Sequence, residues 1–263
     1  MDLEINLTKS IEENASRYFE LSKKSKKKLQ GAKKALEESR KKLALLQQQE
    51  AKFWEEERKK EEVRKLKQER KREWYEKFHW FISSEGFLCV GGKDATSNEI
   101  IIKKHLEKED LVFHTESPGS PFFLIKKGIG AGTATKQEAA QAVAIYSKAW
   151  KFGLTATEVF AIKPEQVSKE AMSGEYMQKG SFMIYGKKEF FHPAVSGAIG
   201  IKEGKIIGGP VNAIQPSAEK YVRIIPGEAK KSDIAKKIKY KLGGGELDDI
   251  IAFLPAGGVQ IER

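Results

Sequence analysis

The stretch KFHWFISSEGFLCVGGKDATSNE, residues 77–99, marks the point where the character of the chain changes. Upstream of it, residues 32–85 contain neither glycine nor proline, and most of that run is charged. Within the stretch, two apolar runs flank a turn at Glu85 and Gly86, which predicts a β-hairpin. We therefore expect an α+β fold, with a long N-terminal α-helical coiled-coil arm followed by a mixed domain of helices and strands.

Residues 1–76 are expected to form a basic coiled-coil arm. They carry 22 Lys+Arg and 16 Asp+Glu, a net of +6, whereas the remainder carries 26 and 21, a net of +5, which together give +11. Apolar and small residues recur in alternating steps of four and three from Ile11 to Phe53, as in a heptad seam. We predict two antiparallel helices with a tip near residues 44–54, and a single long helix is the alternative.

The start and the pairing of this arm follow from the same residues. Thr8 or Ser10 can cap the first helix, and Glu13 would complete a capping box with Ser10. Because serine and alanine occupy many seam positions, the pattern does not choose between an intramolecular hairpin and a dimer.

The remainder divides into a mixed α+β domain, residues 77–190, and a β-rich C-terminal extension packed on it, residues 191–263. Strands outnumber helices and do not alternate regularly with them, which argues against a doubly wound sheet. A clear helix is predicted to close at Gly153. Two capping boxes are predicted to begin helices: Thr96 with Glu99, and Thr135 with Glu138.

Composition limits the classes of function. An excess charge of +11 and a pI near 9.4 indicate an anionic partner, either nucleic acid or an anionic membrane surface. The single cysteine, Cys89, lies in an apolar run and excludes a disulfide framework and a cysteine-based metal site. Neither a membrane span nor a secretion signal is evident, so we expect a cytoplasmic protein without membrane association.

Two basic runs are candidate phosphate-binding surfaces. The run KKSKKKLQGAKK at 23–34 has seven lysines and no acid, and RKLKQERKR at 64–72 has six basic residues and one glutamate. Basic groups that neutralise phosphates release counterions and give affinity without sequence preference. The residues predicted to bind RNA in these runs are Lys23, Lys24, Lys26, Lys27, Lys28, Arg70 and Arg72.

Two loops of the domain are further candidates. In the GGKD turn, glycines allow close backbone approach and Lys93 offers a cation, although Asp94 and Asn98 also fit as turn and cap residues. His114 and Glu116 lie two apart at a strand end and point to one face, as an acid–base pair would. A hydrolase is the weakest hypothesis, because no third ligand or catalytic partner accompanies them. We expect no catalytic residue, metal or cofactor.

At this point the residues resemble a known family. The segment REWYEKFHWFISSEGFLCVGGKDATSNE closely resembles the start of the NFACT-R domain in NEMF-like ribosome quality-control proteins. The blocks DLVFHTESPGSPFFLIKKG and EAAQAVAIYSKAW are similar to the segments that follow, and the next block is of the archaeal and eukaryotic type. Pro118 stands where the family usually has a second histidine, which weakens a catalytic or metal-binding interpretation. Matches in the loop are His114, Glu116, Gly119 and Lys126.

The resemblance implies a function that composition does not. Family members recognise large ribosomal subunits stalled with peptidyl-tRNA and direct template-free tailing of the nascent chain. This chain looks like the C-terminal half of such a protein, without the NFACT-N half. The implied partners are the large ribosomal subunit, rRNA and tRNA, and a partner protein on the coiled coil. The implied RNA-contacting residues are Gly91, Gly92, Lys93, Asp94, Asn98, His114, Glu116, Gly119 and Lys126.

A protein–protein adaptor is the alternative from a different class. In that case the coiled coil would dock a partner protein, and the basic charge would play no direct part in RNA binding.

Overall fold

The computed structural model of the chain describes residues 4–69, 73–168 and 180–262. Contacts divide the chain into two compact units, Met1–Arg72 and Glu73–Arg263. The first unit is helical, and the second, called the compact unit below, mixes helices with antiparallel sheets. The predicted α+β class, with a long N-terminal helix, is therefore confirmed.

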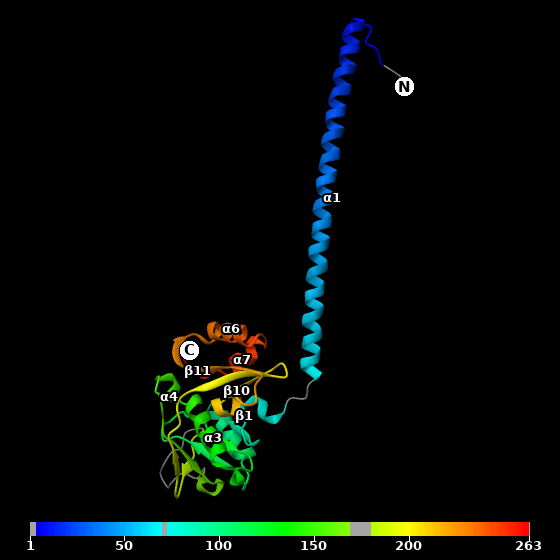
Figure 1. Cartoon of the computed structure of the whole chain (residues 1–263). Coiled ribbons are helices and arrows are strands. Elements are labelled where there is room, and N and C mark those ends of the chain that lie inside the picture. The colour runs from blue at the N-terminus through cyan, green and yellow to red at the C-terminus, as the bar shows by residue number, and fades with distance from the viewer. Residues whose placement is uncertain (1–3, 70–72, 169–179, 263) are drawn as a thin grey trace, which may run out of the picture. The chain divides into compact units, whose positions relative to one another are not determined.

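The first unit consists of one helix, α1 (Ile11–Glu69), which Figure 1 shows as a continuous rod. Its start is the predicted capping box: the backbone N of Glu13 donates to Oγ of Ser10 at 3.1 Å, and the backbone N of Ser10 donates to Oε2 of Glu13 at 2.9 Å. The predicted turn within 44–54 is wrong, since α1 runs unbroken through it. The segment LLQQQEA consists of strong helix formers and offers no glycine or proline to end the helix.

The predicted heptad seam is present on α1 as an exposed stripe. Leu29, Leu36 and Leu43 are 57%, 55% and 57% exposed, and Phe53 is 56% exposed. A seam whose apolar side chains remain half exposed has no packed partner among the described residues.

The compact unit is built first around a six-stranded antiparallel sheet in the order β1-β2-β4-β3-β5-β8. Alternate residues of its strands point to opposite faces, so that Phe113 and Val112 enter different clusters. Helix α3 (Thr133–Tyr146) covers one face, and α2 (Ala95–Ile100) with the π-helical turn η2 (Ile101–His105) covers the other. The strands are β1 His79–Ile82, β2 Leu88–Gly91, β3 Leu111–His114, β4 Phe123–Ile125, β5 Val159–Ile162 and β8 Glu189–Phe191.

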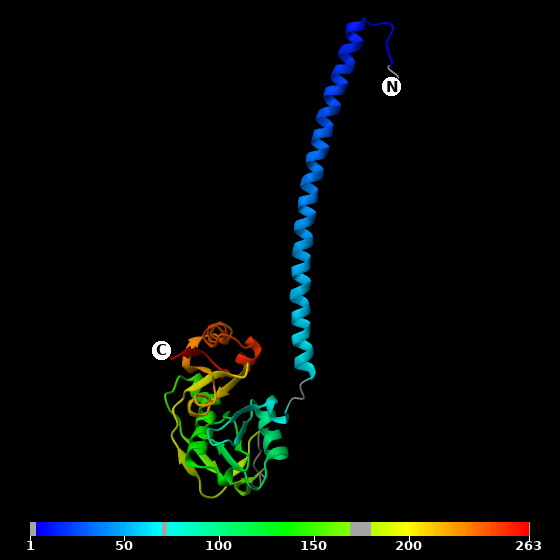
Figure 2. The same ribbon diagram turned by 45° about the vertical axis from the view of Figure 1, so that its right-hand side comes forward.

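A four-stranded antiparallel sheet in the order β10-β9-β11-β12 forms the C-terminal part. Helices α6 (Lys231–Leu242) and α7 (Leu247–Phe253) pack on one face, as Figures 1 and 2 show. The short helix α5 (Val211–Ile214) packs on the other face, against Ala198. The strands are β9 Gly197–Lys202, β10 Lys205–Gly209, β11 Lys220–Ala229 and β12 Val259–Ile261.

The remaining elements are short. A two-stranded sheet pairs β6 (Val167–Ser168) with β7 (Met183–Ile184). Helix α4 (Lys148–Lys151) follows α3. The 3₁₀ helices are η1 Trp74–Lys77, η3 Gly128–Gly130 and η4 Pro164–Gln166.

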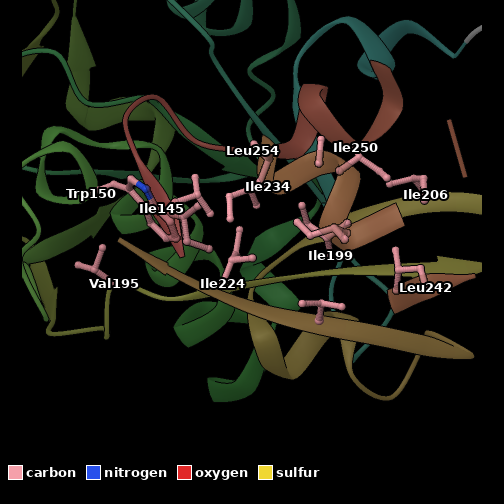
Figure 3. Packing of buried hydrophobic residues seen from close by; sticks show 14 of the residues in the cluster. Ile145, Trp150, Val195, Ile199, Ile206, Ile224, Ile234, Leu242, Ile250 and Leu254 are labelled. Carbon is pink, nitrogen blue, oxygen red and sulfur yellow. The ribbon is translucent and has the colours of Figure 1, made fainter. Parts of the chain in front are cut away.

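One buried cluster joins the two larger sheets (Figure 3). Ile145 of α3 and Trp150 of α4 pack among isoleucine and leucine side chains of β9, β11, α6 and α7. Two hydrogen bonds cross the same junction: Nε1 of Trp150 donates to the carbonyl of Gly258 at 2.9 Å, and the hydroxyl of Tyr146 donates to the carbonyl of Phe253 at 3.0 Å. The C-terminal part is therefore integral to the compact unit.

Helix boundaries differ from the sequence prediction in physically informative ways. The box at α2 is formed by Asp94 with Ser97 instead of Thr96 with Glu99. At α3, Thr135 bonds to the Glu85 carboxylate, which lies far away in sequence. The long predicted helix stops at Tyr146, since Ser147 has extended backbone and its Oγ caps α4.

Aromatic residues at the start of the compact unit pack against its other elements. Phe78 and Phe81 are both 3% exposed, and Trp74 stacks on His105 with ring centroids 4.1 Å apart.

Within the described ranges, none of the helices combines the length and the apolarity needed to cross a bilayer.

Candidate nucleic-acid interface

The lysine run of α1 presents its charge to solvent. Lys23, Lys24, Lys26, Lys27 and Lys28 are all exposed, and no carboxylate partner within ion-pair distance is found for them among residues 4–69. Lys23, Lys24, Lys27 and Lys28 share one helix face, because the last three follow Lys23 by one, four and five positions. Lysines four apart lie about 6 Å apart along the axis, so adjacent ammonium groups can follow a phosphate backbone.

The other predicted basic residues near the end of this helix, Arg70 and Arg72, lie outside the described residues.

The glycines of the GGKD turn serve packing. A Cβ built on Gly91 would lie 2.2 Å from Cε2 of Phe123, and one built on Gly92 would lie 2.0 Å from Oδ1 of Asn98. Both distances are far inside van der Waals contact, so only glycine lets the chain pass at these two points. Both residues are also buried, which removes them from any RNA-contacting surface of this conformation.

The polar residues of the turn hold it in place. Oδ1 of Asp94 accepts the backbone N of Ser97 at 2.7 Å, and Oγ of Ser97 accepts the backbone N of Lys93 at 2.8 Å. Asn98 is buried: its Oδ1 accepts the backbone N of Phe122 at 3.1 Å. Lys93 is the exposed cation of the turn, although partial burial of its ammonium lowers its pKa.

His114 is a structural residue. Its Nδ1 lies 2.5 Å from the carbonyl of Thr115, its Nε2 lies 3.2 Å from the carbonyl of Ser120, and its ring stacks on Phe122 at 4.0 Å. Burial lowers the pKa of His114 to about 4, although the two carbonyls oppose the shift. The imidazole is therefore neutral at pH 7, and both ring nitrogens face the chain's own backbone.

Two lysines that were not predicted from the sequence lie against the loop: Lys188 pairs with Glu116, and Lys148 packs against Gly119. Oε1 of Glu116 pairs with Nζ of Lys188 at 2.5 Å, and that ammonium also lies 4.4 Å from the centre of the Phe160 ring. Gly119 has a φ of +84°, and a Cβ there would lie 2.9 Å from Cε of Lys148. Lys148 and Lys188 approach the loop only through the fold, so no local sequence signal could identify them.

Lys126 forms an ion pair with a buried carboxylate. Its Nζ lies 2.6 Å from Oδ2 of Asp110, which is fully buried, and donates to the carbonyl of His105 at 2.6 Å. Oδ1 of Asp110 accepts the backbone N of Lys127 at 2.9 Å. Lys126 therefore fastens the segment before β3 to the end of β4 and is not available to a phosphate.

The structure thus separates the predicted RNA-contacting residues into two groups. The α1 lysines and Lys93 are exposed cations, whereas Gly91, Gly92, Asn98, His114 and Lys126 support the loops. An acid–base pair of His114 with Glu116 does not form, because each is bonded elsewhere.

Comparison with known proteins shows which family the first part of the compact unit resembles. Residues 77–186 match the family model described as the NFACT protein RNA binding domain. The match begins at the end of η1 and spans both candidate loops, so this part of the chain is similar to the RNA-binding domain of NFACT proteins.

Relatives that match the chain by sequence are ribosome quality control proteins. The chain is 39% identical to the archaeal Rqc2 homolog aRqcH of Methanocaldococcus jannaschii over 208 residues, which are 76% of this chain and 31% of that protein. It is 36% identical to the NEMF homolog of Drosophila melanogaster over 72% of this chain and 18% of that protein. It is 35% identical to human NEMF over 69% of this chain and 16% of that protein.

These matches confirm the resemblance drawn from the sequence. The chain matches the C-terminal part of NFACT/NEMF ribosome quality control proteins. It spans about a third or less of the length of these relatives.

Proposed function

We propose that the chain is the RNA- and ribosome-binding part of a quality-control factor that recognises large ribosomal subunits stalled with peptidyl-tRNA. The observation that carries the proposal is the RNA-binding domain match over residues 77–186 in a chain whose relatives are ribosome quality control subunits. In this proposal the protein acts in the cytoplasm, where stalled subunits occur.

The geometry supports a division of labour within this function. The lysine face of α1 contributes contacts to rRNA phosphates that do not depend on sequence. Lys93, on the exposed GGKD turn of the compact unit, adds a contact on a fixed backbone. The chain performs no chemistry itself, and the ribosome supplies any peptide transfer.

Binding to purified large subunits across a salt series tests the proposal. The variant Lys24→Glu/Lys27→Glu/Lys28→Glu should bind more weakly and with a flatter salt dependence than wild type, because three phosphate contacts are lost. The matched control is Lys41→Glu/Lys42→Glu/Lys52→Glu, which makes the same charge change elsewhere on α1 and should retain most of the affinity. Weak binding without salt dependence for all three proteins would refute direct RNA binding by this chain.

The adaptor function has one specific observation in its favour, the exposed apolar seam of α1 at Leu29, Leu36 and Leu43. Half-exposed leucines at heptad spacing are typical of a helix that docks another helix. Leu29→Ser/Leu36→Ser/Leu43→Ser should abolish capture of a protein partner while leaving the salt dependence of RNA binding unchanged. If that triple variant loses RNA binding as well, the two functions share one surface.

A further inference from the structure

Helix α6 carries a basic solvent face outside residues 77–186, the range that matches the RNA-binding domain. One side of the helix is buried on the four-stranded sheet through Ile234, Ile238 and Leu242. The other side is exposed and consists mainly of lysines: Lys236, Lys237, Lys239 and Lys241 with Tyr240. Such a segregation fixes the orientation of the basic side chains, because the apolar side anchors the helix.

The exposed side chains share one direction and lack anionic partners. Lys236, Lys237, Tyr240 and Lys241 are spaced by one, four and five positions and therefore lie on one face. Within residues 180–262, no carboxylate pairs with these lysines. The one acid of α6, Asp233, lies in its first turn, one turn before Lys236 and Lys237 and two turns before Tyr240 and Lys241.

An open hollow of about 660 Å³ adjoins the C-terminal end of this face. Its lining combines an aromatic ring with two cations: Tyr221, Arg223 and Lys241, together with Val222, Ile261 and Glu262. Tyr221 and Arg223 extend from the face of the sheet opposite α6, because they pair with Gly200 and Ala198, whereas Val222 faces α6. An ion pair of 3.2 Å between Nη1 of Arg223 and Oε2 of Glu262 orients the guanidinium. A Cβ built on Gly243 would lie 3.6 Å from Nζ of Lys220, which places a further ammonium at this end of α6.

Exposed aromatic rings set among cations distinguish this surface from an ordinary solvated helix face. Tyr240 is 88% exposed and Tyr221 is 37% exposed, so neither ring is needed to fill the core. Proteins that bind single-stranded nucleic acid combine a basic track with aromatic rings on which bases stack. A duplex would keep its bases stacked inside and leave both rings without a partner. An interfacial helix inserts an apolar face into lipid, whereas the apolar face of α6 is already packed on the sheet.

We propose that α6 and the adjoining hollow form a second RNA-binding surface, which takes a single strand. The strand follows α6, with bases on Tyr240 and phosphates on the lysines, and passes Lys241 into the hollow, where Tyr221 and Arg223 contact the next nucleotides. This goes beyond the proposed function, because it assigns RNA contact to a part of the chain outside the matched domain and independent of the α1 lysines.

The test uses the full chain and a fluorescent oligouridylate of roughly 20 nucleotides, with binding followed by anisotropy across a salt series. Lys237→Gln/Lys241→Gln should reduce the slope of log K against log salt by about 1.4, since each contact to a single strand contributes about 0.7. Tyr240→Ala should weaken binding about tenfold, whereas Tyr240→Phe, which retains the ring, should bind as wild type. The matched control, Lys104→Gln/Lys108→Gln, removes the same charge from exposed sites elsewhere in the compact unit.

A second readout locates the strand on the molecule. An oligouridylate containing 4-thiouridine should crosslink to peptides that include Tyr221 or Tyr240, and the crosslinks should disappear with the double lysine variant. All substituted positions are exposed, and circular dichroism verifies that the variants fold. A wild-type salt slope in Lys237→Gln/Lys241→Gln, or wild-type affinity in Tyr240→Ala, would overturn the proposal. If Lys237→Gln/Lys241→Gln lost binding to phosphatidylserine vesicles but kept wild-type RNA binding, the partner of this surface would be an anionic membrane and the RNA proposal would be overturned.

Discussion

Lysines in the two units of this protein do opposite things. On α1, Lys24, Lys27 and Lys28 are exposed cations with no acid opposite them among residues 4–69. In the compact unit, Lys126 is directed at the fully buried carboxylate of Asp110 and at the carbonyl of His105. The comparison teaches that a basic residue in an RNA-binding protein contributes affinity or stability according to what the fold places beside it.

The largest expected effect of this difference is on stability. Lys126→Ala should lower the free energy of unfolding of the compact unit by about 3–5 kcal/mol, because it leaves the buried charge of Asp110 without its counter-ion. The equivalent change on α1, Lys28→Ala, should change it by less than about 0.5 kcal/mol. Urea denaturation followed by near-UV circular dichroism measures both.

A double variant serves as the control for that mechanism. Replacing both partners, as in Lys126→Met/Asp110→Leu, removes the uncompensated charge and should recover part of the loss. Equal stability of Lys126→Ala and Lys28→Ala would contradict the buried ion pair.

Glycines allow a second version of the same comparison. Gly92→Ala should destabilise the compact unit by about 3 kcal/mol, because its Cβ would lie 2.0 Å from Oδ1 of Asn98 and force the turn to shift. Gly31 of α1 has nothing within 4 Å of its Cβ position, and Gly31→Ala should stabilise the helix by about 1 kcal/mol. Thermal unfolding of the two variants gives shifts of opposite sign. A shift of the same sign in both would refute the close packing at Gly92.

These examples show which features of the fold are local enough to predict from sequence. The hairpin around Gly86 and the box of Ser10 with Glu13 were predicted correctly, because each depends on residues a few positions apart. The predicted turn of α1 within 44–54 was wrong, because a heptad seam indicates a partner without saying whether the chain folds back to supply it.

The candidate site was less predictable for a related reason. Patterns of residue type indicated the GGKD turn as a candidate site, but packing determines which of its residues are exposed and which support the turn. Asn98 is buried and accepts the backbone N of Phe122 from 24 positions away, and Lys188 reaches Glu116 across 72 positions of sequence. Lys93 is exposed, whereas Gly91, Gly92 and Asn98, which support its loop, are buried, and residue type alone does not give this difference.

Histidines provide a pH-dependent version of the comparison, since all four lie in the compact unit and none in α1. Burial lowers the pKa of His114 to about 4, and burial with the ammonium groups of Lys93 and Lys231 lowers the pKa of His79 to about 3. The unfolded chain, with histidine pKa values near 6.5, therefore binds more protons below pH 6.5, and native stability falls as the pH falls.

Between pH 7 and pH 5, each of these two histidines should cost the compact unit about 2 kcal/mol of unfolding free energy. Urea midpoints measured at both pH values by near-UV circular dichroism test this, and His114→Gln should remove about half of the change. A midpoint that does not depend on pH in this window would mean that the two imidazoles are accessible to protons in the native state.

The smallest change in the free energy of unfolding is expected for substitutions on α1, which should nevertheless change RNA binding strongly. Lys24→Gln/Lys27→Gln/Lys28→Gln removes three exposed charges that support nothing in the described structure, so stability should change by less than about 0.5 kcal/mol. The slope of log K against log salt for single-stranded RNA should nevertheless fall by about 2, since each lost phosphate contact contributes about 0.7. In Lys126→Ala the pattern should reverse, with stability lost and the salt slope of the folded fraction unchanged. If the α1 triple variant keeps the wild-type slope, its lysines are solvated charges and RNA is bound by the compact unit alone.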